Sequence, residues 1–225
     1  MKNKKEQIMK IFLAGATGQT GRRIASELVK RNISVCALVR DENKARKILP
    51  SEVELIIGDV LNPNSFSSAL TNCNIVICAT GATPSLDPTA FYKVDYEGSK
   101  NLINSAKENN IDKFIFVTSL CVSRFFHPLN LFGLVLFWKK QAEKYLINSG
   151  LNYTIVRPAG LKNEDNQYPL VVSGADTLFE GSIPRVKVAQ VCVESIFHPK
   201  TNNHILEIVA KEDAQSKEWS QLFSV

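Results

Sequence analysis

The sequence has few of the residues and segments on which several common classes of protein depend. Its five cysteines are odd in number and form no Cys-x-x-Cys pair, which argues against a disulfide framework or a zinc site and for a reducing compartment. Its three histidines lack metal-ligand spacing, so we expect no metal site. The longest apolar stretch, 125–138, is interrupted by polar residues and falls short of the ~20 residues that a membrane-spanning helix needs.

The sequence also has only a small excess of positive over negative charge. The net charge is only +5, and part of it belongs to lysines in 1–9, which we expect to form a frayed tail. So weak and scattered an excess favours a small anionic ligand, and we expect no nucleic-acid partner. The first apolar run is too short for a signal peptide. We therefore expect a cytoplasmic protein, or a stromal one if the chain is a mature plastid protein.

What the chain does contain is a regular alternation of two kinds of segment. Apolar runs of strand length alternate with amphipathic segments of helical period, which is typical of a parallel sheet with right-handed crossovers. We expect one α/β domain over 10–225, a three-layer doubly wound Rossmann fold of about seven strands. Within it, 160–184 is expected to be irregular and to form most of the substrate side. The expected strands cover 10–14, 33–39, 53–57, 74–79, 113–118, 153–156 and 205–209.

The first expected strand runs directly into a glycine-rich turn, and a helix follows at once. In this turn Gly15 permits the tight bend, Gly18 lets the backbone approach a pyrophosphate, and Gly21 lets the helix pack closely on the sheet. Backbone N–H groups at the start of the helix attract the anion. The turn therefore predicts a dinucleotide site that comprises Gly15, Thr17, Gly18, Gln19, Thr20 and Gly21.

Residues at the ends of the next strands predict which dinucleotide binds. An NAD site places an acid at the end of the second strand, whereas this chain has Arg40, whose guanidinium suits the 2′-phosphate of NADP(H). Asp41 follows it, so NAD(H) stays open as the less favoured cofactor. Asp59 is expected to accept a hydrogen bond from the adenine amino group, with Val60 against the ring. The small residues that end the fourth strand leave room for the ribose: Ala79, Thr80 and Gly81.

These motifs resemble the short-chain dehydrogenase/reductase superfamily in its atypical branch, over nearly the whole of 10–210. The segments 15–21, 38–41 and 58–60 are similar to biliverdin-IXβ/flavin reductases. Segments 139–146, 149–151 and 153–158 are similar to cyanobacterial and plastid proteins that include translocon-associated dehydrogenase-like proteins. The resemblance implies the Rossmann fold and NADP(H) binding. It leaves the reaction open, because members include reductases, isomerases and proteins without known chemistry.

Active members of that superfamily use Ser, Tyr and Lys, with the Tyr and Lys four residues apart on one helix. The resemblance places Ser119 at the serine and Lys139 at the lysine, which would hold the nicotinamide ribose. Val135 stands where the tyrosine belongs, and it cannot transfer a proton. Pro158, after the sixth expected strand, would shape the nicotinamide pocket.

The missing tyrosine leaves three explanations open. The substrate draws its proton from solvent, as a flavin or a tetrapyrrole can; another acid such as Tyr92 supplies it; or nothing is turned over. The favoured function is hydride transfer, dependent on NADP(H), to or from a conjugated small molecule. The alternative is a non-catalytic NADP(H)-sensing or assembly protein that docks on a membrane or a protein complex.

The stretch 125–138 is apolar on nearly all its faces. A helix over 131–148 would place Leu131, Leu134, Val135 and Trp138 on one stripe toward the core, yet its other faces are apolar too. Either 160–184 covers these groups, or they form the lip of an apolar substrate pocket, or they form a surface for a protein partner or a membrane. In the last case the lysines over 139–144 would favour anionic lipid.

Overall fold

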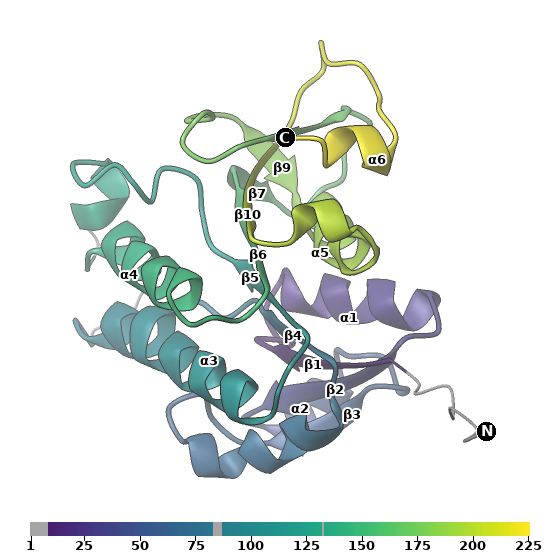
Figure 1. Cartoon of the computed structure of the whole chain (residues 1–225), viewed down its shortest axis with the longest axis vertical. Helices are drawn as coiled ribbons and strands as arrows, with labels where there is room; N and C mark the ends of the chain where they lie inside the picture. The colour runs from purple at the N-terminus through teal and green to yellow at the C-terminus, as the bar shows by residue number, and fades with distance from the viewer. Residues whose placement is uncertain (1–8, 83–86, 132) are drawn as a thin grey trace.

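The computed structural model describes residues 9–82, 87–131 and 133–225. The expected tail, apart from its last residue, therefore lies outside the described residues, and so does position 132 of the apolar stretch. In Figure 1 a twisted sheet separates two layers of helices, with α1 and α5 on one face and α3 and α4 on the other. The expected three-layer doubly wound fold is confirmed.

The sheet is parallel over most of its width. Its strand order is β3-β2-β1-β4-β5-β6-β10-β9-β7, with β8 also paired to β10. Each neighbouring pair from β3 to β10 is parallel. The strands β2 and β3 lie on one side of β1, and the chain then crosses to β4 on the other side of β1. A crevice therefore opens between the carboxyl ends of β1 and β4. These strands are β1 (Lys10–Ala14), β2 (Ser34–Val39), β3 (Glu54–Ile57), β4 (Ile75–Cys78), β5 (Lys113–Val117), β6 (Tyr153–Pro158) and β10 (His204–Ala210).

The described residues form ten strands, so the expectation of about seven is wrong. The three additional strands all lie in 160–184, which was expected to be irregular: β7 (Gly160–Lys162), β8 (Leu170–Ser173) and β9 (Ser182–Pro184). Both β8 and β9 pair antiparallel with β10. Backbone N–H and C=O groups of β8 and β9 therefore form hydrogen bonds with β10. These strands are too short to show a strand pattern in the sequence.

Two apolar cores, one on each face, hold the helices to the sheet. Successive side chains of β1 alternate between them, because Ile11 and Leu13 join one core and Phe12 joins the other. The principal helices are α1 (Gly21–Lys30), α3 (Ser99–Glu108), α4 (Val135–Ile147) and α5 (Arg185–Phe197). Shorter helical segments are α2 (Glu42–Arg46), α6 (Trp219–Leu222), η1 (Pro63–Ser65), η2 (Ser67–Asn72), η3 (Tyr92–Gly98), η4 (Pro128–Leu131) and η5 (Pro199–Thr201).

The apolar stretch 125–138 does not form the single long helix expected from 131. The short helix η4 ends at Leu131, and α4 begins only at Val135, after Leu134 in a left-handed conformation with φ of 58°. The side-chain oxygen of Asn130 accepts the N–H groups of Leu136 and Phe137 and so caps α4. This break resets the helical phase: Leu136 is 1% exposed, whereas Leu131 is 85% exposed. The predicted core-facing stripe is therefore wrong for Leu131 and Leu134, whereas Val135 packs against a core.

Candidate functional site

The glycine turn lies at the crevice and leaves no space for side chains. Gly15 has φ of +81°, and a Cβ there would lie 2.5 Å from the carbonyl oxygen of Ala79, the residue that follows β4. A Cβ on Gly21 would collide with the carbonyl oxygen of Gly15. The N–H of Gly18 donates to that same oxygen at 3.0 Å, which closes the turn. The turn therefore brings bare backbone to the start of α1, as a pyrophosphate site requires.

A hollow of about 420 Å³ opens beside this turn, at the ends of β1 to β4. Nine of the predicted cofactor residues line it: Gly15, Thr17, Gly18, Arg40, Asp59, Val60, Ala79, Thr80 and Gly81. Gln19 does not line it; its side-chain oxygen instead accepts hydrogen bonds from Arg22 and Arg23. Thr20 and Gly21 lie outside its lining too, at the entry to α1. The hollow thus gathers residues from four separate strand ends.

The two charged residues after β2 have different surroundings. The carboxylate of Asp41 accepts the N–H of Lys44 at 3.0 Å and caps the start of α2. Arg40 is exposed and, among the described residues, makes no ion pair. Asp59 accepts the N–H of Leu61 at 2.9 Å through one of its two carboxylate oxygens. Arg40 is therefore available to an anion at the hollow, whereas Asp41 already has a structural role.

Lys139 does not line the first hollow but lies beside the end of β4, in a buried ion pair that the sequence did not reveal. Its Nζ lies 2.6 Å from Oδ1 of Asp95, a side chain on η3 that is 1% exposed. The other oxygen of Asp95 accepts the N–H of Ala82 at 3.3 Å. The pair lies next to the end of β4, because a Cβ on Gly81 would be 3.8 Å from Nζ of Lys139. A buried carboxylate needs a cation, but nothing local in the sequence marks Asp95 as buried.

Ser119 and Pro158 lie at a second hollow, of about 440 Å³, beyond the ends of β5 and β6. Lys139 does not line this hollow, and Val135 packs against the core on the α1 and α5 side. The hydroxyl of Tyr92 donates to Glu97 at 2.9 Å, and this contact raises the pKa of the phenol. Tyr92 lines neither hollow. Ser119 therefore lies at the same hollow as Pro158, whereas Lys139 lies elsewhere, next to Gly81.

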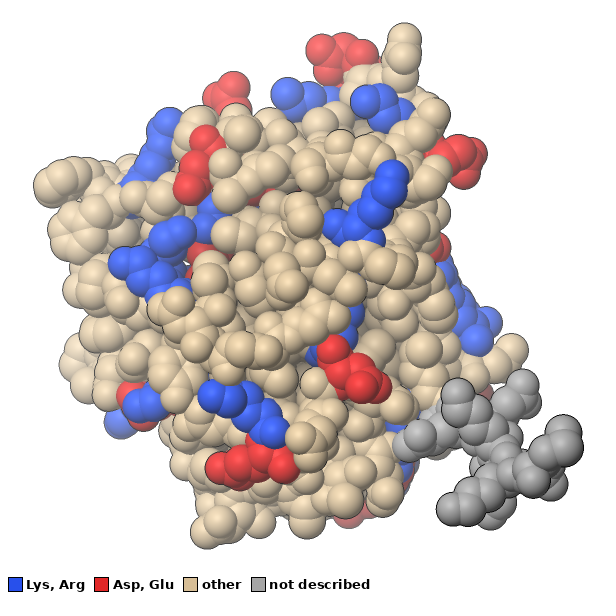
Figure 2. Space-filling model, in the orientation of Figure 1, with Lys and Arg blue, Asp and Glu red and all other residues tan. Residues whose placement is uncertain are grey.

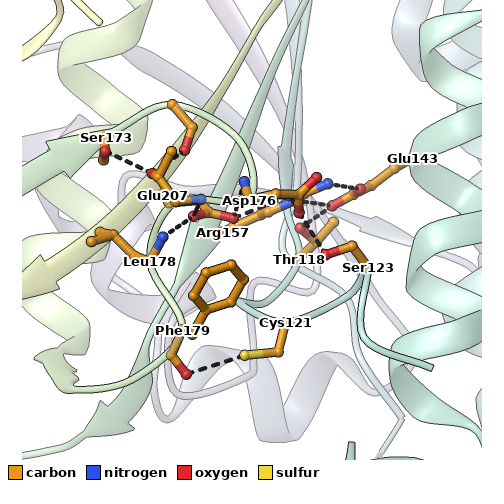
Figure 3. Close-up of polar contacts among 12 residues, drawn as sticks. Thr118, Cys121, Ser123, Glu143, Arg157, Ser173, Asp176, Leu178, Phe179 and Glu207 are labelled. Carbon is orange, nitrogen blue, oxygen red and sulfur yellow. Dashed lines mark hydrogen bonds and ion pairs between the residues drawn. The ribbon is translucent and has the colours of Figure 1, made fainter. Parts of the chain in front are cut away.

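A buried arginine next to Pro158 joins polar side chains from several elements (Figure 3). Arg157 on β6 is fully buried and makes two hydrogen bonds, of 2.9 and 2.7 Å, to the carboxylate of Glu143 on α4. Its Nη1 lies 2.8 Å from Asp176 and 3.1 Å from Glu207. Burial lowers the pKa of Arg157, but the hydrogen bonds and charges of Glu143, Glu207 and Asp176 together raise it by more, so the net shift is upward. Each buried charge is thus matched by a partner.

Glu207 extends this network to the loop that walls the hollow. Its carboxylate accepts three backbone N–H groups, from Asp176, Thr177 and Leu178, at 2.9, 3.0 and 2.7 Å. The next residue, Phe179, lines the hollow, and its ring lies 3.7 Å from the guanidinium carbon of Arg124. Sequence reasoning quoted Arg157 only as part of a motif and missed this role.

The apolar stretch remains largely at the surface. Phe126 is 97% exposed and Leu131 is 85% exposed, so 160–184 does not cover them, and that expectation is wrong for these two residues. His127 and Leu129 line the second hollow, so part of the stretch forms its lip. On the face drawn in Figure 2, Lys and Arg side chains are scattered among acidic and uncharged surface. Among the described residues, no helix is long and apolar enough to span a membrane, and no group of side chains is arranged to hold a metal.

The fold and the crevice define a Rossmann-type protein that binds a nicotinamide dinucleotide and is related to the atypical short-chain dehydrogenases/reductases. Residues 15–199 match the family described as NAD(P)H-binding, and the chain belongs to this family. An uncharacterized chloroplastic protein of Arabidopsis thaliana is 40% identical over 96% of this chain and 81% of its own length. The chloroplastic protein TIC 62 of Arabidopsis thaliana is 35% identical over 94% of this chain, which spans only 37% of that protein.

Further relatives include enzymes and proteins with solved structures. The sanguinarine reductase of Eschscholzia californica is 29% identical over 95% of this chain and 94% of its own length. A putative NAD-dependent epimerase/dehydratase of Bacillus halodurans has a TM-score of 0.82 and 28% identity, and the match covers 91% of this chain and 95% of that one. A short-chain dehydrogenase/reductase of Veillonella parvula, solved in complex with NADP, has a TM-score of 0.72 at 18% identity, over 94% and 99% of the two chains.

Proposed function

We propose that this protein is an NADP(H)-dependent oxidoreductase that transfers hydride to or from a conjugated small molecule, flavin-like or tetrapyrrole-like. The observation that carries the proposal is the pair of hollows at the carboxyl ends of the strands. The first is lined by the glycine turn and Arg40, and the second is largely apolar and lies at Ser119 and Pro158. A dinucleotide that runs along the strand ends from the first hollow would present its nicotinamide to the second.

The surroundings of Arg40 support NADP(H) over NAD(H). Its guanidinium has no ion-pair partner among the described residues, and Asp41, the acid that would favour NAD(H), caps α2 instead. The ribose 2′-phosphate would supply the anion that Arg40 lacks. The cradle itself fits a dinucleotide, because a side chain on Gly15 or Gly21 would fill it.

Lys139 and Asp95 would act on the ribose next to the nicotinamide. Asp95 holds the ammonium group beside Gly81 at 2.6 Å, and Lys139 retains N–H groups to donate to a ribose hydroxyl. NADPH, when bound, supplies a hydride. Val135 cannot donate a proton and Tyr92 lines neither hollow, so in this proposal the product takes its proton from solvent. That route suits a conjugated acceptor, which spreads the added charge over its π system.

Oxidation of NADPH in the presence of flavins and bilins, followed at 340 nm, tests the proposal. We expect turnover with at least one acceptor. A Gly15→Ala variant is the matched control and should lose cofactor binding, because its Cβ would meet the backbone of Ala79. If NADPH binds and none of the acceptors is reduced, hydride transfer to this class of molecule is refuted, and the non-catalytic alternative is favoured.

A second candidate function is contact with an anionic membrane surface through the exposed part of 125–131. Phe126 and Leu131 are the most exposed large apolar side chains among the described residues. No acidic residue stands between Asp112 and Glu143 in the sequence, whereas Arg124 and Lys140 do. Apolar side chains on an acid-free, mildly basic segment favour peripheral insertion among anionic headgroups. The membrane would face the cytoplasm or, if this protein is located in a plastid as its chloroplastic relatives are, the stroma.

Co-sedimentation with vesicles tests this contact. The protein should pellet with vesicles that contain phosphatidylglycerol and should stay in solution with phosphatidylcholine alone. Phe126→Ser combined with Leu131→Ser should abolish pelleting and leave NADPH binding intact. Phe197→Ser, which removes an exposed ring (48% exposed) at the end of α5, is the control and should pellet normally. Equal recovery of all three proteins would contradict the proposed contact.

A further inference from the structure

Two arginines from different helices converge on one asparagine. Arg23 on α1 donates from Nη2 to the backbone oxygen of Asn163 at 3.2 Å. Arg185, the first residue of α5, donates from Nη1 to the side-chain oxygen of the same Asn163 at 2.8 Å and to the carbonyl oxygen of Leu161 at 3.3 Å. The two guanidinium groups therefore lie close together, although like charges repel.

Neither guanidinium makes an ion pair with a carboxylate among the residues that the structure describes, in contrast to Arg31 and Arg157. Arg31 and Arg157 each bind two or more acidic side chains. Arg185 has only neutral partners, and burial, together with the charge of Arg23, lowers its pKa. A partly desolvated cation next to another cation is an unfavourable arrangement that an anion would relieve.

The free edge of Arg185 has the geometry of an anion clamp. Nη1 makes both of the hydrogen bonds to Asn163 and Leu161. Nε and Nη2 make none to the described residues, and their N–H groups are parallel on one side of the planar guanidinium. This side is the edge through which arginine binds a carboxylate or a phosphate with two hydrogen bonds.

Arg185 lines the second hollow and also a neighbouring hollow of about 480 Å³, which it shares with Asn163, Glu164 and Asp165, and it is not among the residues that line the first. The walls of this hollow are mostly apolar, and they include Leu120, Ala159 and Phe179. Glu180 also lines the hollow but makes no ion pair with Arg185, so an anionic group is favoured only at the arginine end. A flat apolar body with one charged arm fits this distribution.

We propose that Arg185, supported by Asn163 and Arg23, binds a carboxylate or phosphate group of the substrate. The inference rests on the proposed function, because it takes the second hollow as the substrate site. It restricts the conjugated substrate to molecules with an anionic arm. Arg185 acts directly on that group, and Arg23 is a positioning residue that adds charge behind it.

Matched ligand pairs test the inference in the protein saturated with NADP⁺. Biliverdin is compared with its dimethyl ester, and FMN with riboflavin, by equilibrium titration. Within each pair the conjugated system is the same and only the anionic arm differs. We expect the anionic member to bind about tenfold tighter or more in at least one pair. Arg185→Gln should bring that ratio close to one, and Arg185→Lys should keep part of it. Lys187→Gln, on the same helix but outside the lining, should leave the ratio unchanged.

Two kinds of result overturn the inference, and a third overturns only the proposed reaction. A ratio near one in the unchanged protein, or no binding of any of the four compounds, excludes recognition of an anionic arm. A preserved ratio in Arg185→Gln together with weaker NADP⁺ binding assigns the arginine to the cofactor phosphates instead. If the ratio behaves as expected but NADPH is not oxidised by the bound compound, the anion site stands and the proposed reaction fails. Melting temperatures of the variants identify any loss that is due to unfolding.

Discussion

Replacement of Glu207 by alanine is the most direct perturbation of the wall of the second hollow. The carboxylate of Glu207 is 1% exposed and receives three backbone N–H groups from the 176–178 loop, as well as Nη1 of Arg157. Glu207→Ala removes the acceptor and leaves these four donors behind. The loop then loses its side-chain link to β10, and Phe179 keeps its backbone hydrogen bond from Cys121 but loses the support of the neighbouring loop residues.

The expected loss of stability follows from these contacts. Breaking a buried ion pair by removal of one partner costs about 3–5 kcal/mol. Arg157 keeps Glu143 and Asp176, and the loop N–H groups can turn toward water, so we expect about 3–4 kcal/mol. At about 2–4 °C per kcal/mol for a chain of this size, the melting temperature should fall by about 6–16 °C. Glu207→Gln keeps one acceptor oxygen and should cost about half as much.

Urea denaturation and thermal melting measure the change. Glu52→Ala is the control, since Glu52 is exposed, makes no ion pair among the described residues, and should change stability by no more than about 0.5 kcal/mol. Weaker binding of the substrate in Glu207→Gln, at unchanged NADPH affinity, would report on the loop separately from global stability. If Glu207→Ala unfolds at the same urea concentration as Glu52→Ala, the network does not hold the loop as described.

Three further predictions concern the cofactor and pH. Arg40→Ala should erase a preference for NADPH over NADH of about tenfold or more, and it should leave NADH affinity unchanged. Lys139→Met should weaken NADPH binding about tenfold and should also destabilise the protein, because it leaves the buried Asp95 unpaired; adding Asp95→Asn should restore stability but not affinity. Burial lowers the pKa of Lys113 to about 8. Between this value and about 10.4 the unfolded chain binds a proton that the folded chain has released, so stability relative to Lys113→Met should rise with pH by about 3 kcal/mol over this range, and by about 2 kcal/mol between pH 7.5 and 9.5.

Each of these predictions has its own control and contradicting result. Isothermal titration of both cofactors checks Arg40, with Lys44→Ala as a nearby charge control, and equal affinities in the unchanged protein would contradict the NADP(H) assignment. For Lys139, normal NADPH affinity in the methionine variant would show that the ammonium group does not reach the ribose. For Lys113, urea titrations at pH 7.5 and 9.5 measure the difference in stability between the unchanged protein and Lys113→Met. A difference between the two proteins that is independent of pH would mean that Lys113 stays protonated beside the carbonyl oxygen of Ser195.

The features that the sequence predicted correctly are those that depend on neighbouring residues. Apolar runs bounded by turns predicted the parallel strands from β1 to β6, because burial on both faces of a parallel sheet demands continuous apolar residues. The glycine spacing predicted the turn, since only glycine tolerates φ of +81° and the close approach of Ala79 at position 15. The strands β7, β8 and β9 were missed, because their backbone groups are paired by a distant strand and not by any pattern of their own.

The partners of the buried charges were decided only by the tertiary structure. Asp95 and Lys139 are far apart in the sequence, and so are Arg157 and Glu207, or Arg23 and Arg185. The sequence around a charged residue does not show whether its side chain will be exposed to water or buried. Its partner becomes obligatory only when folding removes water from it, because the cost of desolvation must then be offset by an opposite charge or a hydrogen bond. Residue types and their spacing could therefore predict a dinucleotide site at the strand ends, whereas the packing of α4, α5 and β10 around the crevice determined which ionic groups meet there.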